Sequence, residues 1–351
     1  MVLTRKGATI FDKDNAVVQR EAIKHTTATS LVDKANYRHF MAKEIHEQPE
    51  VVGHTLARYV DMATERVALP VKLPFDFKDI QRVSITACGT ASYAGYVGKY
   101  WFERFARLPV EIDVASGIPL PRGAACARAI SRSSSRSPAR PPTRWRRLRY
   151  AKAQGAHTLS VVNVPTSTIA RESETVLPTL AGPEIGVAST KAFTCQLMVL
   201  AALAVAAGQA RGELSEADES QARAWPGRDP AADGGGADAR AADRTSWRAT
   251  SRSPATCSIS AAAPAIPLAL EGALKLKEIS YIHAEGYAAG ELKHGPIALI
   301  DENMPVVVIA PYDQVFEKTV SNMQEVAARG GKIILMTDAK GARGGDHQTR
   351  W

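Results

Sequence analysis

The chain has 351 residues, of which 45% are hydrophobic and 23% are charged. This length and composition are sufficient for two domains with proper cores, which excludes a wholly disordered chain. No apolar run reaches about 18 residues, so we expect no membrane partner. Residues 1–9 lack the apolar core of a secretory signal, and we expect a cytoplasmic protein.

The formal net charge of +8 comes from one stretch. Residues 128–149 contain eight arginines and no acidic residue, so the remainder of the chain is neutral overall. Arginine-rich runs can bind RNA through its phosphates, but the local origin of the charge predicts no nucleic-acid partner for the protein. Four scattered cysteines show no metal-ligand spacing, so we predict free thiols, no metal and no cofactor.

The first part of the chain predicts a hairpin followed by helices. Residues 9–11 and 16–18 are short alternating runs separated by a polar turn, which is the pattern of a β-hairpin. Apolar residues then recur at mixed three- and four-residue spacing over residues 37–60, which predicts helix. Because proline is tolerated at the first turn of a helix, we expect Pro49 to begin a second helix.

The rest of the chain alternates strands with helices, and two irregular stretches interrupt this pattern. Residues 117–149 and 225–265 are rich in Arg, Ala and other small or polar residues and have no periodicity. The regular alternation predicts an α/β fold with parallel sheets covered on both faces. The predicted strands are 82–87, 110–114, 158–163, 305–310 and 332–336, and the main predicted helices are 90–105, 189–206, 268–281 and 315–328.

Two loops that lead into helices carry candidate binding residues. Residues 88–92 follow a strand and open a helix, where free backbone N–H groups and a threonine hydroxyl favour a phosphate. A strand, a glycine turn and a helix also occur without any ligand, so this motif alone leaves both interpretations open. Residues 182–191 form a second such loop, in which Ser189 is a candidate helix N-cap.

The segment from Glu271 to Pro296 carries the acid–base chemistry. Glu271, Lys275 and Glu278 are spaced to share one face of a helix, and His294 precedes a glycine turn. A carboxylate, an amine and an imidazole close together suit ring opening and proton transfer between adjacent sugar carbons. The spacing alone is equally consistent with a row of solvated ion pairs.

Four motifs together resemble one family. Residues 36–49, 87–90, 182–193 and 273–296 closely resemble the glutamine–fructose-6-phosphate aminotransferases (isomerizing), in consistent order and spacing. That family has a glutaminase domain and two sugar isomerase (SIS) domains, and makes glucosamine 6-phosphate from fructose 6-phosphate and glutamine in hexosamine biosynthesis. The resemblance implies two tandem SIS domains, each a parallel-sheet α-β-α sandwich with the second truncated, that bind a phosphosugar and form a homodimer.

The resemblance also implies roles for individual residues. Glu278 would be the base that moves a proton between C1 and C2, and Lys275 would lie beside it. His294 would assist ring opening, in its own site or in that of the neighbouring subunit. The substrate-binding residues that the resemblance implies are Gly89, Thr90, Ala91, Val187, Ser189 and Thr190.

The expected domain division follows the same resemblance. Residues 1–34 are the remnant of the end of a glutaminase domain, 35–75 a helical lead-in, 76–212 the first SIS domain with 117–147 anomalous, 213–250 an anomalous linker, and 251–351 the truncated second SIS domain. Neither a glutaminase nucleophile nor the terminal Schiff-base lysine of the family has a counterpart in this sequence. We therefore expect an inactive or impaired enzyme, or alternatively a non-catalytic phosphosugar-binding SIS module.

A third departure concerns the phosphate loop. The family motif Ser-Gln-Ser-Gly-Glu-Thr is expected near residues 136–141, which here read Arg-Ser-Pro-Ala-Arg-Pro. Codons for residues 136–147 read one base earlier can give that motif, and a shifted frame over 255–266 can give the first strand and loop of a second SIS domain. The hypothesis is that both irregular stretches are frameshifted. Because prolines remove N–H donors and oppose helix, we expect an irregular segment there.

Overall fold

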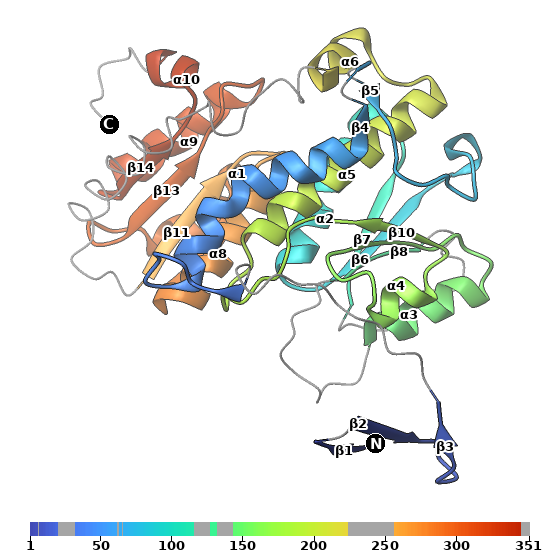
Figure 1. The fold of residues 1–351 in the computed structure, drawn as a ribbon. Helices are drawn as coiled ribbons and strands as arrows, with labels where there is room; N and C mark the ends of the chain where they lie inside the picture. The colour runs from blue at the N-terminus through green and yellow to red at the C-terminus, as the bar shows by residue number, and fades with distance from the viewer. Residues whose placement is uncertain are drawn as a thin grey trace.

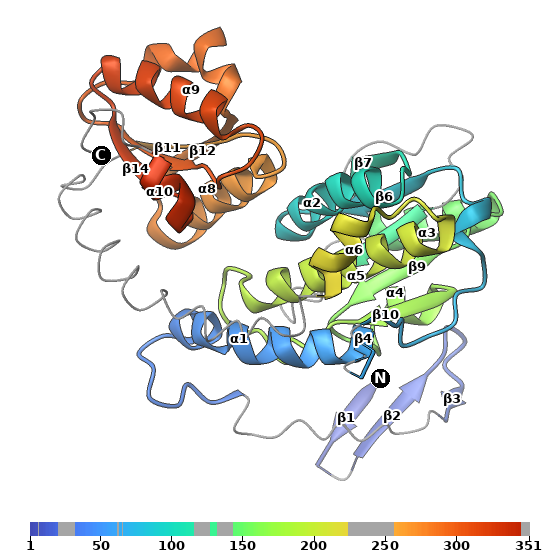
Figure 2. The ribbon, with the colours of Figure 1, turned by 90° about the horizontal axis from the view of Figure 1, so that it is seen from above.

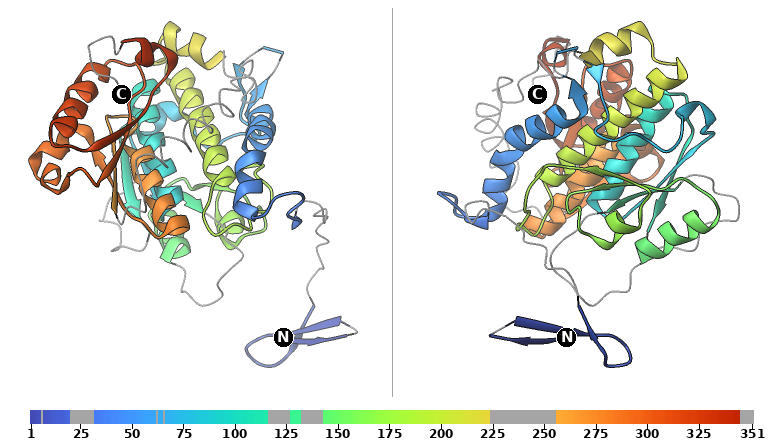
Figure 3. Two further views of the ribbon diagram at one scale, coloured as in Figure 1. Left: turned by 90° about the vertical axis from the view of Figure 1, so that its left-hand side faces the viewer. Right: turned by 45° about the vertical axis from the view of Figure 1, so that its right-hand side comes forward.

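The computed structural model contains two parallel sheets, each covered by helices (Figure 1). A separate antiparallel hairpin lies at the N-terminus, and Figure 3 shows it set apart from both sheets. The residues that the structure describes are 1–5, 7–19, 32–61, 63–64, 66–115, 127–131, 143–223 and 256–344.

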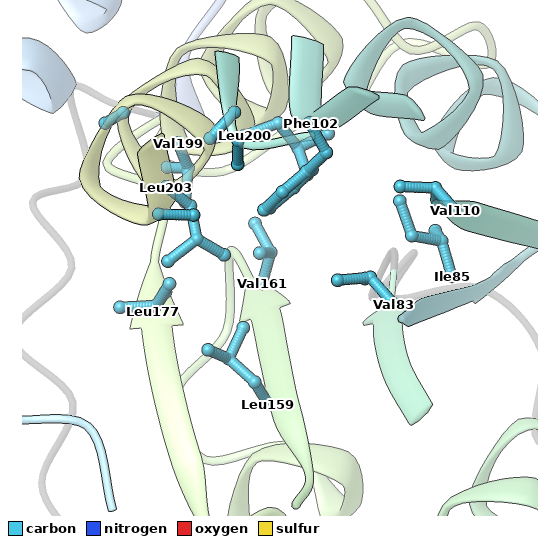
Figure 4. Packing of buried hydrophobic residues seen from close by; sticks show 14 of the residues in the cluster. Val83, Ile85, Phe102, Val110, Leu159, Val161, Leu177, Val199, Leu200 and Leu203 are labelled. Atoms are coloured by element: carbon cyan, nitrogen blue, oxygen red, sulfur yellow. The ribbon is translucent and has the colours of Figure 1, made fainter. Parts of the chain in front are cut away.

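The first sheet has five parallel strands in the order β10-β9-β8-β6-β7. They are β6 (Val83–Ala87), β7 (Val110–Val114), β8 (Ala127–Ser131), β9 (Leu159–Val162) and β10 (Thr175–Pro178). Its helices are α2 (Thr90–Phe105), α3 (Thr143–Ala153), α4 (Thr168–Glu172) and α5 (Lys191–Arg211). Val161 packs in the cluster with α2 and α5 (Figure 4). Its neighbour Val162 packs with Leu148 of α3. Because adjacent strand residues point to opposite faces, this sheet is buried on both sides.

The second sheet has four parallel strands in the order β12-β11-β13-β14. They are β11 (Thr256–Ala261), β12 (His283–Ala288), β13 (Pro305–Ile309) and β14 (Lys332–Met336). Helix α8 (Ile266–Ser280) covers one face and α9 (Phe316–Ala328) the other, and α10 (Ala339–Gly344) follows (Figure 2). Helix α8 also contacts α2 of the first domain, so the two domains meet along these helices.

The N-terminal hairpin is confirmed, and the predicted break in the following helix is wrong. Strands β2 (Gly7–Phe11) and β3 (Val17–Val18) pair antiparallel, and β1 (Val2–Thr4) adds a third strand. Helix α1 (Phe40–Tyr59) is continuous, with Pro49 inside it. Proline cannot donate to the carbonyl four residues earlier, but the side-chain amide of Gln48 donates to that Ile45 carbonyl at 3.3 Å. This substitute bond helps the helix to pass the proline.

The irregular stretches contain regular elements that their composition did not indicate. Strand β8 and the start of α3 lie within 117–149, and β11 lies within 225–265. The phosphate-loop residues 136–141 lie outside the described residues. Three elements in regular sequence were also not predicted, namely α4, β10 and β12. The remaining short elements are β4 (Val60–Asp61), β5 (Arg66–Val67), α6 (Glu216–Arg223) and the 3-10 helices η2 (Phe77–Asp79), η3 (Ala289–His294) and η4 (Pro296–Leu299).

Helix α5 is the central helix of the first domain. By length and composition it is the one candidate membrane span among the described residues, and 72% of its apolar window is buried inside the protein. It packs on α1 and α2 and contributes Val199, Leu200 and Leu203 to the main core (Figure 4). A helix that is apolar on all sides is what a buried position requires, so we interpret α5 as a core helix.

Candidate functional site

The charged face predicted for α8 exists and forms one network. The ammonium group of Lys275 donates to the carboxylate of Glu278 and lies 3.4 Å from Oε1 of Glu271. The spacings of three and four residues place all three side chains on one side of the helix, as predicted. The side chain of Glu278 is 28% exposed, whereas that of Glu271 is 8% exposed. Glu278 is therefore the carboxylate that a ligand can reach.

Thr90 connects this network to the first domain. It is the first residue of α2, directly after the turn at Gly89, whose φ of 57° favours glycine. The Thr90 hydroxyl is buried, donates to Oε1 of Glu271 at 3.0 Å and accepts from Lys275 at 3.1 Å. The site thus forms where the N-terminus of one domain's helix meets the side of a helix from the other domain.

Glu271 has an unusual electrostatic environment. Burial raises its pKa to about 7, against the opposing effects of Lys275 and of the hydrogen bond from Thr90. Its second oxygen, Oε2, is buried and has no hydrogen-bond partner among the described residues. Burial, together with the charge of Glu271, also raises the pKa of Tyr93. Glu271 can therefore gain or lose a proton near neutral pH, at a point adjacent to Thr90 and Lys275.

The second predicted loop is organised by Glu184. Its Oε1 accepts the backbone N–H groups of Thr190 and Ala192, and both its oxygens accept from the Ser189 hydroxyl. The prediction that Ser189 caps the helix is therefore wrong, because Thr190 is the N-cap residue and a carboxylate from outside the helix supplies the acceptor. A negative charge here also complements the positive end of the α5 dipole. Val187, in the same loop, is 78% exposed.

Other predicted residues lie apart from the α8 network. His294 ends η3 and is exposed, and among the described residues no hydrogen bond or ion pair joins it to Lys275 or Glu278. Ala91 is fully buried in the main core, so its side chain is not available to a ligand. The Thr190 hydroxyl is buried without a partner among the described residues.

Sequence reasoning gave no role to two acids of this region. Glu271 was on the predicted helix face, but its burial against Thr90 depends on the contact between the domains. Glu184 lies within the predicted loop of residues 182–191, five residues before Ser189, and that proximity to the helix start is the signal in the sequence for its role. Both are acids within motifs that were already singled out for other residues.

Three further features of the described residues stand apart from the α8 network. A cavity of about 350 Å³ lies beyond the end of β11 and shares no residue with the α8 network; Ala262, Gly290, Lys293 and Lys318 are among its lining residues. Burial raises the pKa values of the thiols of Cys195 and Cys257 to about 11, so neither is a thiolate nucleophile at neutral pH. Within the described ranges, no cluster of His, Cys, Asp and Glu could hold a metal ion.

Comparison with known proteins places the chain in a family. Residues 76–206 and 261–348 match the SIS domain family. A glutamine–fructose-6-phosphate aminotransferase (isomerizing) of Bradyrhizobium diazoefficiens is 71% identical over 347 residues, covering 97% of this chain and 56% of that protein. The solved C-terminal domain of the glucosamine-fructose-6-phosphate aminotransferase from Francisella tularensis superposes with a TM-score of 0.79 at 37% identity, over 89% of this chain and 87% of that one.

The chain belongs to the glutamine–fructose-6-phosphate aminotransferase family, in its SIS domain portion. This finding confirms the resemblance and the α/β parallel-sheet fold that the sequence predicted. The chain spans about half the length of the curated relatives that it matches, including one of Rhizobium meliloti at 55% identity over 350 residues, of which it covers 56%. A glucosamine-6-phosphate deaminase from Thermotoga maritima, at 18% identity and a TM-score of 0.62, shares the fold alone.

Proposed function

We propose that this chain is the isomerase-domain portion of an aminotransferase that makes glucosamine 6-phosphate from fructose 6-phosphate and glutamine. The observation that supports this most is the network of Thr90, Glu271, Lys275 and Glu278 across α2 and α8. It brings a helix N-terminus, which favours a phosphate, next to a carboxylate that a ligand can reach. The domain division predicted from the sequence, with SIS domains at 76–212 and 251–351, is part of this proposal.

The proposed chemistry assigns a task to each group. The sugar phosphate binds near the turn of Gly89 and Thr90, at the first N–H groups of α2, which precede the helix's own hydrogen bonds; these begin with the N–H of Ser92, which donates to the Gly89 carbonyl at 2.8 Å. Glu278 takes the proton from one sugar carbon and returns it to the next, which interconverts ketose and aldose. Lys275 lies between the two carboxylates and offsets the negative charge that accumulates there.

Two further assignments concern His294, in the site of a second subunit, and the loop of residues 182–190. His294 is exposed and apart from the network, so we propose that it assists ring opening in the site of a partner subunit within a homodimer. Val187, Ser189 and Thr190 line the sugar pocket, and the exposure of Val187 is compatible with contact to a ligand. The proposal includes a cytoplasmic location and no nucleic-acid, membrane, metal or cofactor partner.

The phosphate loop limits the expected activity. Residues 136–141 read Arg-Ser-Pro-Ala-Arg-Pro, and prolines supply no N–H donors to a phosphate. We therefore propose weakened phosphosugar binding and impaired turnover, with the two irregular stretches arising from frameshifts. The coding DNA tests this directly. The frameshift hypothesis is rejected if the alternative reading frame does not encode Ser-Gln-Ser-Gly-Glu-Thr at this place.

One experiment separates the enzyme from its alternative, a non-catalytic phosphosugar-binding module. The chain is mixed with fructose 6-phosphate, with and without glutamine or ammonia, and both the melting temperature and the sugar products are followed. Formation of glucose 6-phosphate or glucosamine 6-phosphate supports the enzyme, and a thermal shift without product supports the binding module. No shift and no product would contradict both. Fructose without its phosphate is the control ligand, and it should bind more weakly.

A further inference from the structure

The loop of residues 182–190, which carries Val187 and Ser189, is held in place by helix α1. The carboxylate of Glu44 accepts the backbone N–H groups of Ile185 and Gly186, at 2.6 and 2.9 Å. These residues are about 140 positions away along the chain, so the contact is a feature of the tertiary structure. Residues 182–190 form no regular helix or strand, and an irregular segment needs such outside partners for its backbone groups.

The contact is buried and closely fitted. Glu44 is 2% exposed. Gly186 has no Cβ, and a Cβ built there would lie 2.6 Å from Oε2 of Glu44. Hydrogen bonds from N–H groups to a buried carboxylate are stronger than neutral ones. The position of the backbone at Ile185 and Gly186 therefore depends on the position of the Glu44 side chain.

A second acid on α1 holds the other end of the loop. Glu47, one turn after Glu44, accepts from the Lys191 ammonium at 2.6 Å and lies 3.4 Å from that of Lys43. Lys191 is buried at the first residue of α5, where the helix dipole disfavours a cation. Glu47 offsets this charge, so α1 fixes both the start and the end of the segment that carries Val187 and Ser189.

We infer that Glu44 is a positioning residue for the phosphosugar site. It does not contact the sugar itself; it sets the backbone at Ile185 and Gly186, and through it the placement of Val187. The inference rests on the proposed function, since it assumes that this loop lines the sugar pocket. It makes α1 a working part of the site, whereas its sequence indicated only a lead-in to the first domain.

The test compares two substitutions at Glu44 in the full chain. Glu44→Ala removes the acceptor and should weaken fructose 6-phosphate binding about tenfold, because two hydrogen bonds that fix the loop are lost. Glu44→Gln retains a carbonyl oxygen for both N–H groups and should bind within about threefold of the unsubstituted chain. Glu50→Ala, an exposed acid on the same helix, is the matched control and should leave affinity unchanged.

Amide hydrogen exchange supplies a readout that needs no ligand. The amides of Ile185 and Gly186 should exchange slowly in the unsubstituted chain and in Glu44→Gln, and rapidly in Glu44→Ala. If Glu44→Ala does not fold, Gly186→Ala replaces it, because its new methyl group displaces the carboxylate and should weaken binding similarly.

The outcomes distinguish the two claims. Unchanged affinity and unchanged exchange in Glu44→Ala would overturn the positioning role while leaving the proposed function intact. Failure of the unsubstituted chain to bind fructose 6-phosphate would overturn the proposed function and the effect on affinity together. Weak binding by Glu44→Gln, equal to that of Glu44→Ala, would show that the charge matters instead of the backbone contacts, and would also overturn the inference.

Discussion

The two domains begin with the same strand–turn–helix unit, and in the first domain the start of the helix joins the charged network. In the first domain β6 leads through Gly89 and Thr90 into α2, and the threonine hydroxyl joins the charged network. In the second, β11 leads through residues 262–265 into α8, whose N-cap residue Ala265 has no polar side chain and whose first turn contains a proline. That proline removes an N–H donor from the helix N-terminus.

The difference shows that fold and chemistry are separable within one chain. The second domain contributes through the side of its helix, where Glu271 and Lys275 contact Thr90 of α2 and Lys275 holds Glu278. The first contributes through the end of its helix. The site therefore needs both domains in contact. The two sheets share one strand order, β7-β6-β8-β9 in the first domain and β12-β11-β13-β14 in the second, and the first sheet adds β10 at its edge. The following predictions test this division of roles, beginning with the largest expected effect.

Glu278→Gln should abolish most proton transfer while leaving binding intact. Removing a general base costs about 10²- to 10⁴-fold in rate, and the amide has the size of the carboxylate it replaces. Exchange of the C1 proton of fructose 6-phosphate in heavy water, followed by NMR, measures this step even at low turnover. Glu285→Gln, an acid on β12, is the control. Equal exchange in Glu278→Gln and in the unsubstituted chain would remove Glu278 from the chemistry.

Lys275→Ala should destabilise the contact between the domains. The substitution leaves the buried Glu271 without its cation, and breaking a buried pair in this way costs about 3 kcal/mol. The melting temperature should fall by several degrees, because 1 kcal/mol corresponds to about 2 to 4 °C in proteins of roughly 150 to 250 residues and to less in longer chains. Lys277→Ala removes an exposed lysine from the same helix and should have little effect. Similar melting temperatures for the two variants would contradict the network's structural role.

Stability should fall as the pH rises from about 4.5 to above 7 because of Glu271. Its pKa is raised from 4.5 to about 7 by burial, so the folded protein binds the proton more tightly than the unfolded chain. This contribution to the free energy of unfolding is fully present below the pKa of the unfolded chain and is lost as the pH rises through the pKa of the folded protein. The contribution of this pKa shift to the free energy of unfolding is on the order of 3 kcal/mol. The free energy of unfolding, measured with urea, should differ less between pH 5 and pH 8 in Glu271→Gln than in the unsubstituted chain. An equal difference in both would exclude Glu271 as its source.

Much of this arrangement could be predicted from local pattern, but its long-range contacts could not. The face of α8 follows from helical spacing alone, and β6, β13 and β14 follow from compact apolar runs. The bond from Thr90 to Glu271 joins residues 181 positions apart, and no periodicity encodes it. Strand β8 can form in arginine-rich sequence because its backbone pairs with β6 on one side and β9 on the other. Backbone hydrogen bonds do not depend on side-chain type, so the composition of this stretch did not indicate the strand.

Thr90→Val gives the smallest predicted effect and the sharpest contrast between the domains. Valine keeps the shape of threonine but loses the hydroxyl that donates to Glu271 and accepts from Lys275, which should cost about 1 to 2 kcal/mol. Ser258→Ala in the second sheet removes a buried hydroxyl that has no partner among the described residues, so its stability should be unchanged or slightly higher. Denaturant unfolding compares the two. A larger loss of stability from Ser258→Ala than from Thr90→Val would mean that the stabilising polar contacts lie in the second domain's sheet, which would contradict the division of roles between the domains.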